Sequence, residues 1–126
     1  MPLFSVSGTW QMNHDGWVGT LVINPPDQVL NEVDGPCAYH YSPLDGTYTN
    51  AGFGQLLVVG TVGGQDRNYR NGQQCPQADH RIDFTVAFPG APPQPFTGYG
   101  FTHDGSRMAG YTWWQGIPFG WYAQKL

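Results

Sequence analysis

Charged residues are scarce in this sequence. They make up 11% of its 126 residues, against about 25% in an average globular protein. The five basic residues include no adjacent pair, so the chain lacks a basic patch of the kind that binds nucleic acid. Glutamate and lysine occur once each, at Glu32 and Lys125. Because both residue types favour helices, their scarcity argues against a helical fold.

Long apolar runs are also missing. No stretch approaches the roughly 18 apolar residues of a membrane-spanning helix, so we expect no membrane span. Residues 1–5 do not begin a basic region followed by an apolar stretch, so we expect no signal peptide. A cytoplasmic protein and the mature form of a secreted one both stay open. No His-x-His or His-x-x-x-His spacing occurs, and we predict neither a metal site nor a cofactor.

Glycine, proline and aromatic residues are plentiful instead. The chain has 18 glycines, 11 prolines and 15% aromatics. Aromatics spread along the whole length argue against disorder, so the glycines and prolines indicate turns between short strands. The length fits one domain over residues 1–126.

Alternation with a period of two is the main structural signal. Near the N-terminus one strand face carries Phe4, Val6, Gly8, Trp10 and Met12. The clearest strand later in the chain points Ile82, Phe84, Val86 and Phe88 inward. His14-Asp15-Gly16 and His103-Asp104-Gly105 are typical hairpin turns, and we expect both histidines to be exposed there.

The same pattern predicts eight to ten short strands in all. Further strands are expected at residues 17–24, 29–33, 37–41, 47–49, 55–62, 96–102, 107–114 and 117–124. Turns are expected at residues 42–46 and 50–52, and a long polar loop at 63–79. Because nearly every link is a short hairpin, we predict an all-β fold, a small antiparallel up-and-down barrel, with a β-sandwich as the alternative.

Two stretches resemble known β-barrel families. Ser7-Gly8-Thr9-Trp10 resembles the Gly-x-Trp on the first strand of lipocalin- and avidin-type barrels. Residues 108–123 resemble the hairpin repeated in the Oscillatoria agglutinin type of β-barrel lectin. The resemblance implies a barrel fold and a ligand-binding activity.

Tryptophan occurs at Trp10, Trp17, Trp113, Trp114 and Trp121, and Trp10, Trp113, Trp114 and Trp121 are candidates for ligand contact. Adjacent strand residues point to opposite faces, so Trp113 and Trp114 cannot both lie in one core. One of them is predicted to stack on a sugar ring or a flat apolar ligand, or else to pack across strands against Trp121 or Tyr122.

The 63–79 loop is the second candidate. Its side chains at Asp66, Arg67, Tyr69 and Arg70 suit hydrogen bonds to a polar ligand or a lid over a barrel mouth. Surface mobility without a function is the alternative.

His40 is the best candidate for proton transfer, because it lies mid-strand between Tyr39 and Tyr41. The alternative is a structural histidine with satisfied hydrogen bonds. The two cysteines, Cys37 and Cys75, predict either one disulfide or two separate thiols.

These observations favour a protein that binds a small molecule or a glycan at an aromatic-rich site. The leading alternative is a cofactor-independent enzyme of the cyclase or isomerase type, with His40 and a tyrosine moving protons. A homo-oligomeric assembly protein that uses exposed aromatics as its interface is a third hypothesis.

Overall fold

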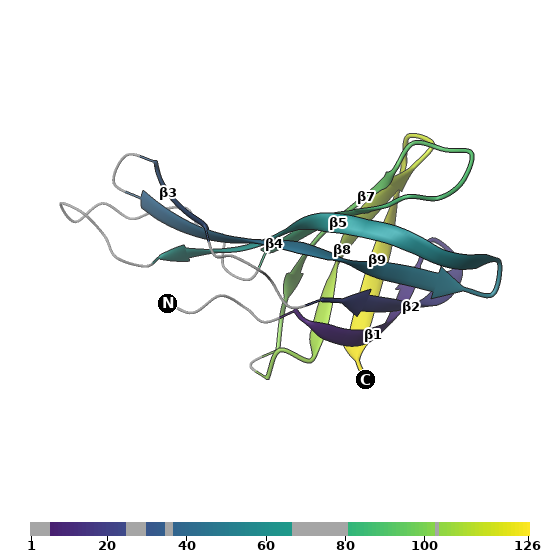
Figure 1. The fold of residues 1–126 in the computed structure, drawn as a ribbon, viewed down its shortest axis with the longest axis horizontal. Helices are drawn as coiled ribbons and strands as arrows, with labels where there is room; N and C mark the ends of the chain where they lie inside the picture. Colours follow the sequence, from purple (N-terminus) through teal and green to yellow (C-terminus); the bar gives the residue numbers. More distant parts are fainter. Residues whose placement is uncertain (1–5, 25–29, 35–36, 67–80, 103) are drawn as a thin grey trace.

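The computed structural model describes residues 6–24, 30–34, 37–66, 81–102 and 104–126. This part of the chain contains nine β-strands and no helix (Figure 1). The strands are β1 Gly8–His14, β2 Trp17–Ile23, β3 Leu30–Asp34, β4 Cys37–Asn50, β5 Phe53–Asp66, β6 Arg81–Val86, β7 Gln94–Gly100, β8 Arg107–Trp114 and β9 Ile117–Lys125. The predicted all-β class is therefore confirmed. Within the described ranges there is no helix of the length and apolarity needed to cross a membrane.

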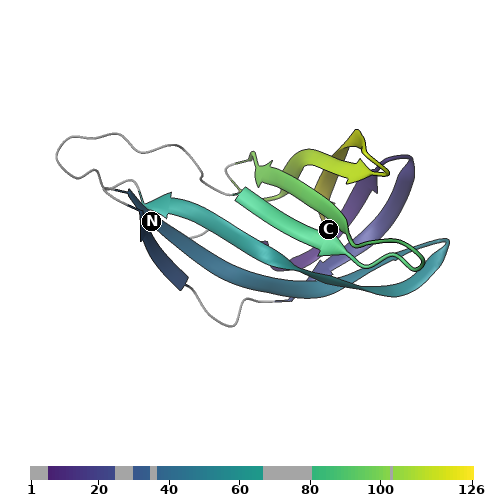
Figure 2. The ribbon, with the colours of Figure 1, turned by 90° about the horizontal axis from the view of Figure 1, so that it is seen from above.

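Eight of the strands close into an antiparallel barrel. From β4 to β9 each strand pairs with the next along the chain, β9 then pairs with β1, and β1 with β2. The additional pairing of β2 with β4 completes the ring, while β3 pairs only with β4. Figure 2 shows β3 and the adjoining ends of β4 and β5 projecting from the barrel. The predicted barrel is confirmed, and the sandwich alternative is wrong.

The turn predicted at residues 42–46 is wrong, because β4 runs through it as one strand of 14 residues. β3 pairs with residues 37–41 of β4, and β2 with residues 46–50, so neither of these two ladders includes residues 42–45. Pro43 lies in this interval, where its missing N–H breaks no ladder. A Cβ at Gly46 would come within 1.9 Å of the Val22 carbonyl oxygen. Gly46 therefore permits the close approach of β2 and does not form a turn.

The polar loop predicted for residues 63–79 is wrong for its first four residues. Residues 63–66 continue β5 and pair with residues 38–41 of β4. Residues 67–80 lie outside the described residues.

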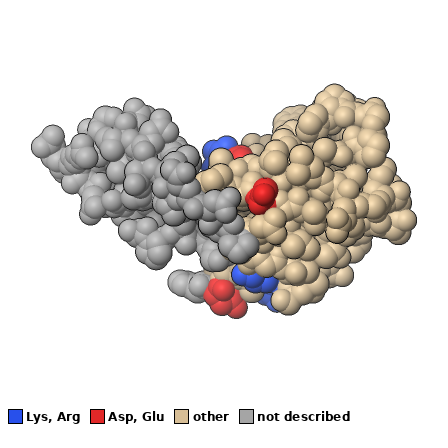
Figure 3. Space-filling view, in the orientation of Figure 1, with Lys and Arg blue, Asp and Glu red and all other residues tan. Residues whose placement is uncertain are grey.

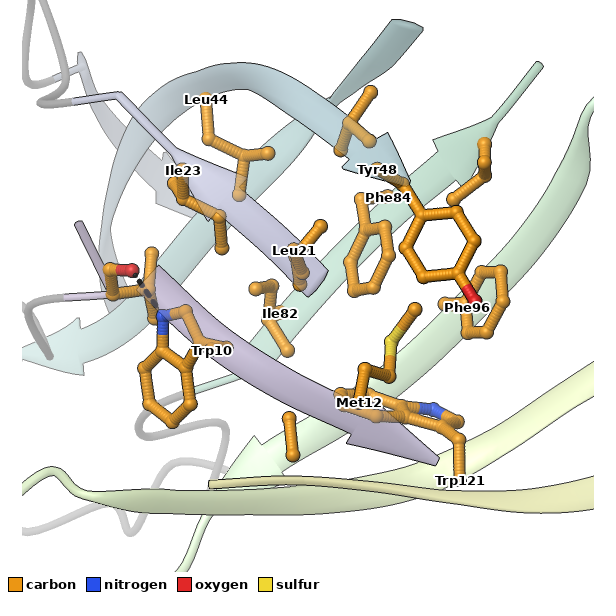
Figure 4. Close-up of a cluster of buried hydrophobic side chains, with 14 of the residues drawn as sticks. Trp10, Met12, Leu21, Ile23, Leu44, Tyr48, Ile82, Phe84, Phe96 and Trp121 are labelled. Carbon is orange, nitrogen blue, oxygen red and sulfur yellow. Dashed lines mark hydrogen bonds between the residues drawn. The ribbon is translucent and has the colours of Figure 1, made fainter. Parts of the chain in front are cut away.

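Side chains from all eight barrel strands fill the interior. The alternation predicted for β1 and β6 is confirmed, because Trp10, Met12, Ile82, Phe84 and Val86 are buried. Figure 4 shows Trp10, Met12, Leu21 and Phe96 pointing into the space between the strands, with the Trp121 indole next to Met12. The described interior is therefore a packed core, and a ligand site must lie at an end or on the outer surface.

Candidate functional site

The candidate site begins at His14, the last residue of β1. Sequence composition predicted an exposed turn residue, but His14 is only 3% exposed. The prediction is wrong because the inward alternation of Trp10 and Met12 continues for one more step. The turn starts one residue later, with positive φ angles at Asp15 and Gly16.

Both ring nitrogens of His14 are hydrogen-bonded. Nδ1 contacts the Asp15 carboxylate oxygen Oδ1, and Nε2 lies 2.6 Å from the Tyr48 hydroxyl. An ionised carboxylate only accepts hydrogen bonds, so Nδ1 is assigned as the donor to Asp15. In that tautomer the neutral ring accepts the Tyr48 O–H at Nε2. Asn50 Nδ2 donates to the Tyr48 oxygen at 3.3 Å, which leaves the phenol proton available for His14.

The Tyr48 phenol stays protonated at neutral pH. Burial is the largest cause that raises its pKa above the ordinary 10.0, and the Asp15 charge adds to it, while the Asn50 hydrogen bond acts against both. The ring packs closely over Gly19, where a Cβ would come within 2.3 Å of it. β2 thus holds the phenol against His14.

Gln94 extends the polar network to β7 and β8. It is 3% exposed, and its Nε2 donates to Asp15 Oδ1 at 3.3 Å and to Thr112 Oγ1 at 2.8 Å. The Thr112 hydroxyl donates in turn to the Pro95 carbonyl at 2.7 Å. A buried amide nitrogen that donates to two partners has a fixed orientation, so Gln94 is a second, fixed donor to the Asp15 oxygen that contacts His14.

These polar groups lie at the base of a pocket of about 290 Å³. His14, Asp15 and Gln94 contribute polar atoms, and the walls are Trp17, Phe53, Phe88, Pro89 and Trp114. The pocket is at the end of the barrel where β1 meets β2, β4 meets β5 and β6 meets β7.

The four aromatic walls form a continuous chain of rings. Ring centroids are 6.4 Å apart between Trp17 and Phe53, 5.5 Å between Phe53 and Phe88, and 6.4 Å between Phe88 and Trp114. The angles between ring planes range from 56° to 74° along this chain. Trp17 is 47% exposed, which places it at the rim. The tilted rings make a curved apolar wall around the polar base.

The two adjacent tryptophans separate as the alternation predicts. Trp114 lines the end pocket, whereas Trp113 is exposed on the outside of β8. Both also line a second hollow of about 520 Å³ beside the proline-rich residues 89–95. The structure therefore brings Trp114 to the candidate site.

Trp10 and Trp121, two further predicted ligand contacts, are both buried in the core. Trp10 is fully buried, and its indole N–H donates to the Val6 carbonyl at 2.9 Å (Figure 4). Trp121 is 3% exposed and donates to the carbonyls of Thr97 and Tyr111. Their polar atoms are satisfied by backbone, so we assign both to packing.

The other predicted site residues lie away from the pocket or outside the described part. The backbone of Tyr39, His40 and Tyr41 lies where β4 pairs with β3 and with residues 63–65 of β5, beyond the β2–β4 ladder. Asp66 ends β5 and pairs with Ala38. The side chains at these positions are not among those described. Arg67, Tyr69, Arg70 and His103 fall outside the described residues, and so does the Cys75 half of the predicted Cys37–Cys75 disulfide.

A second aromatic feature lies on the outer surface of β7 and β8. Tyr99, Tyr111 and Trp113 are 44%, 49% and 45% exposed, and the last two contact each other edge to face at 6.4 Å. Beside them Arg81 and Thr97 donate hydrogen bonds to the Asp83 carboxylate. The hydrogen bond between Arg81 and Asp83 raises the pKa of Arg81. Glycan binding stays a prediction, and this surface is where stacking rings and polar groups occur together.

Charged side chains and possible metal ligands do not form a further candidate site among the described residues. Figure 3 shows few charged side chains over the described part of one face. Among the described side chains, no group of three or more histidines, cysteines or carboxylates is placed to hold a metal ion.

Most pocket residues were missed by sequence reasoning. Only Trp114 was predicted as a ligand contact, and Phe88 was predicted to face inward. The signal for His14 was the alternation of β1, and Gln94 follows a run of prolines with no signal of its own. No family model, curated protein or solved structure matches this chain, so the geometry of the pocket carries the functional argument.

Proposed function

We propose that this protein binds a small organic molecule in the aromatic pocket at the end of its barrel. The observation that carries the proposal is the convergence of His14, Asp15 and Gln94 at the base of a pocket with four aromatic walls. Ligand sites typically combine a concave apolar wall with a few fixed polar groups. The volume of about 290 Å³ is at the small end of such sites and favours a compact ligand.

The hydrogen-bond network supports this proposal because it orients the polar groups before any ligand arrives. Asp15 is held by His14 and Gln94, and His14 is held by Tyr48. A site that is already ordered loses less entropy on binding. The exposed rim at Trp17 supports it as well, since covering exposed aromatic surface is favourable.

Native mass spectrometry of the protein purified from its source tests the proposal. A co-purified small molecule is the expected result, and NMR of the tryptophan indole N–H groups then locates it. Trp114→Ala should abolish binding, because it removes a pocket wall. Trp113→Ala is the matched control, since the neighbouring residue does not line this pocket and should leave binding unchanged. Equal behaviour of the two variants would contradict the proposal.

A second candidate function is proton transfer without a cofactor in the same pocket. The contact of His14 with the Asp15 carboxylate favours it, since a carboxylate orients an imidazole for general acid–base work. The predicted acid–base role of His40, with Tyr39 or Tyr41, stays a separate hypothesis. For an enzyme at the pocket, His14→Gln should remove turnover of the bound molecule while the protein still binds it. Turnover that survives in His14→Gln rejects this candidate.

A further inference from the structure

Asp15 is the most unusual group in the end pocket. Its side chain is 9% exposed and lines the pocket. Oδ1 accepts from both His14 and Gln94, whereas no hydrogen bond to Oδ2 comes from any residue in the described ranges. A largely buried carboxylate normally has a charge partner or a full set of donors. Within the described part of the chain, Oδ2 of this carboxylate is therefore available to a ligand.

Among the residues that the structure describes, no arginine or lysine lines this pocket. The Asp15 carboxylate therefore has no guanidinium or ammonium partner among the lining residues, and its hydrogen bonds come from His14 and Gln94. The whole chain also carries a net charge of −4. A cationic ligand would be attracted to this site, and an anionic one repelled.

The aromatic walls favour the same sign of charge. The faces of Trp and Phe rings are electronegative and attract organic cations at about 6 Å or less from the ring centroid. Trp17, Phe53, Phe88 and Trp114 supply four such rings around one space. Because successive rings are tilted against one another, they surround a rounded group better than a flat one.

We infer that the end pocket takes an organic cation, with its alkylated ammonium group among the four aromatic rings and beside Asp15. This inference rests on the proposed small-molecule binding and names the ligand class. A bare metal ion is a poorer match, because Asp15 is the only carboxylate among the described residues that line the pocket and such ions need several oxygen ligands. An alkylated ammonium gains from the rings and from the carboxylate together.

The test compares choline with 3,3-dimethyl-1-butanol, in which a neutral carbon replaces the charged nitrogen. Titration of the wild-type protein, followed by the tryptophan indole signals, should give choline about tenfold tighter binding or more than the alcohol. Because the two probes have the same shape, this comparison isolates the charge and needs no variant. Equal affinities, or no choline binding, would overturn the inference.

Asp15→Asn gives an independent second measurement. It should remove most of the preference for choline over the alcohol, measured as the ratio of the two affinities in the same variant, after a thermal melt has established that the variant is folded. Asp104→Asn is the matched control, because it removes the same charge from an exposed turn between β7 and β8. A preference for choline that survives in Asp15→Asn counts against the carboxylate.

Failure of the inference is separable from failure of the proposed function. A neutral aromatic probe, benzyl alcohol, reports on the pocket without any charge. If benzyl alcohol binds and Trp114→Ala abolishes that binding, the pocket function stands even where choline has no advantage. If neither probe binds and the source protein carries no ligand, both fail.

Discussion

Nε2 of His14 and the hydroxyl of Tyr48 lie 2.6 Å apart, although 34 residues separate them in the sequence. The contact joins the end of β1 to the interior of β4, and both side chains are buried. It connects Tyr48 to the polar network that His14, Asp15 and Gln94 form at the pocket. Its loss should therefore be visible in stability before any ligand is known.

Tyr48→Phe should destabilise the fold by about 1–3 kcal/mol, because it leaves a buried imidazole nitrogen without its partner. Urea unfolding at neutral pH measures this free energy. Tyr122→Phe is the control, since its hydroxyl is in an exposed contact with Gln124 at 3.3 Å, and it should change stability by less than about 0.5 kcal/mol. Equal effects of the two substitutions would show that the His14 contact contributes nothing.

The same phenol should make stability depend on pH in the alkaline range. Burial raises the pKa of Tyr48 above 10.0, so the folded state holds this proton more tightly than the unfolded chain. Its contribution is fully present below pH 10.0 and is lost as the pH rises towards the folded-state pKa. Urea unfolding followed from about pH 8 to about pH 11 should show this decline in the wild type and a shallower one in Tyr48→Phe. Parallel curves would contradict the assignment.

The barrel could be predicted because its main signal is local. Alternation along Ile82, Phe84 and Val86 needs only the strand itself, and it held in the structure. The course of β4 could not be predicted in the same way. Pro43 and Gly46 usually end strands, and they are tolerated here because of where β2 and β3 stop. That information lies in the partner strands β2 and β3 and cannot be obtained from the residues of β4 alone.

The candidate site was harder to predict than the fold for the same reason. Its lining residues come from separate stretches of the chain that only barrel closure brings together. Asp15 and Gln94, for example, are hydrogen-bonded although they are 79 residues apart in the sequence. Trp113 and Trp114 were both predicted as candidates because two adjacent tryptophans cannot share one face, and the alternation alone did not decide which of them faces the pocket. His14 was missed because His-Asp-Gly is typical of an exposed turn, although the burial of Met12 two residues earlier pointed inward.

Gly19→Ala should destabilise the protein by about 1–3 kcal/mol through overpacking. The added methyl would meet the Tyr48 ring at 2.3 Å, and that ring cannot retreat without breaking its contact with His14. Gly54→Ala is the matched control, because a Cβ there meets nothing within 4 Å. We expect this second variant to be neutral or slightly stabilising. Thermal melts of the pair measure the difference, and similar melting temperatures would show that Tyr48 is free to move.

Gln115→Asn should stabilise the hairpin between β8 and β9. Gln115 and Gly116 form its two-residue turn, with φ angles of 51° and 78°. Both values are in the left-handed region, where a long side chain is strained by about 1 kcal/mol and asparagine is tolerated better. The variant creates an Asn-Gly pair, the preferred sequence for this turn, and should gain a few tenths of a kcal/mol up to about 1 kcal/mol in urea unfolding. Gln124→Asn, at an exposed position in β9, tests whether the gain comes from the turn, since a strand disfavours asparagine and should lose stability. A loss at position 115 as well would mean that the Gln115 side chain has a stabilising contact that outweighs its backbone strain.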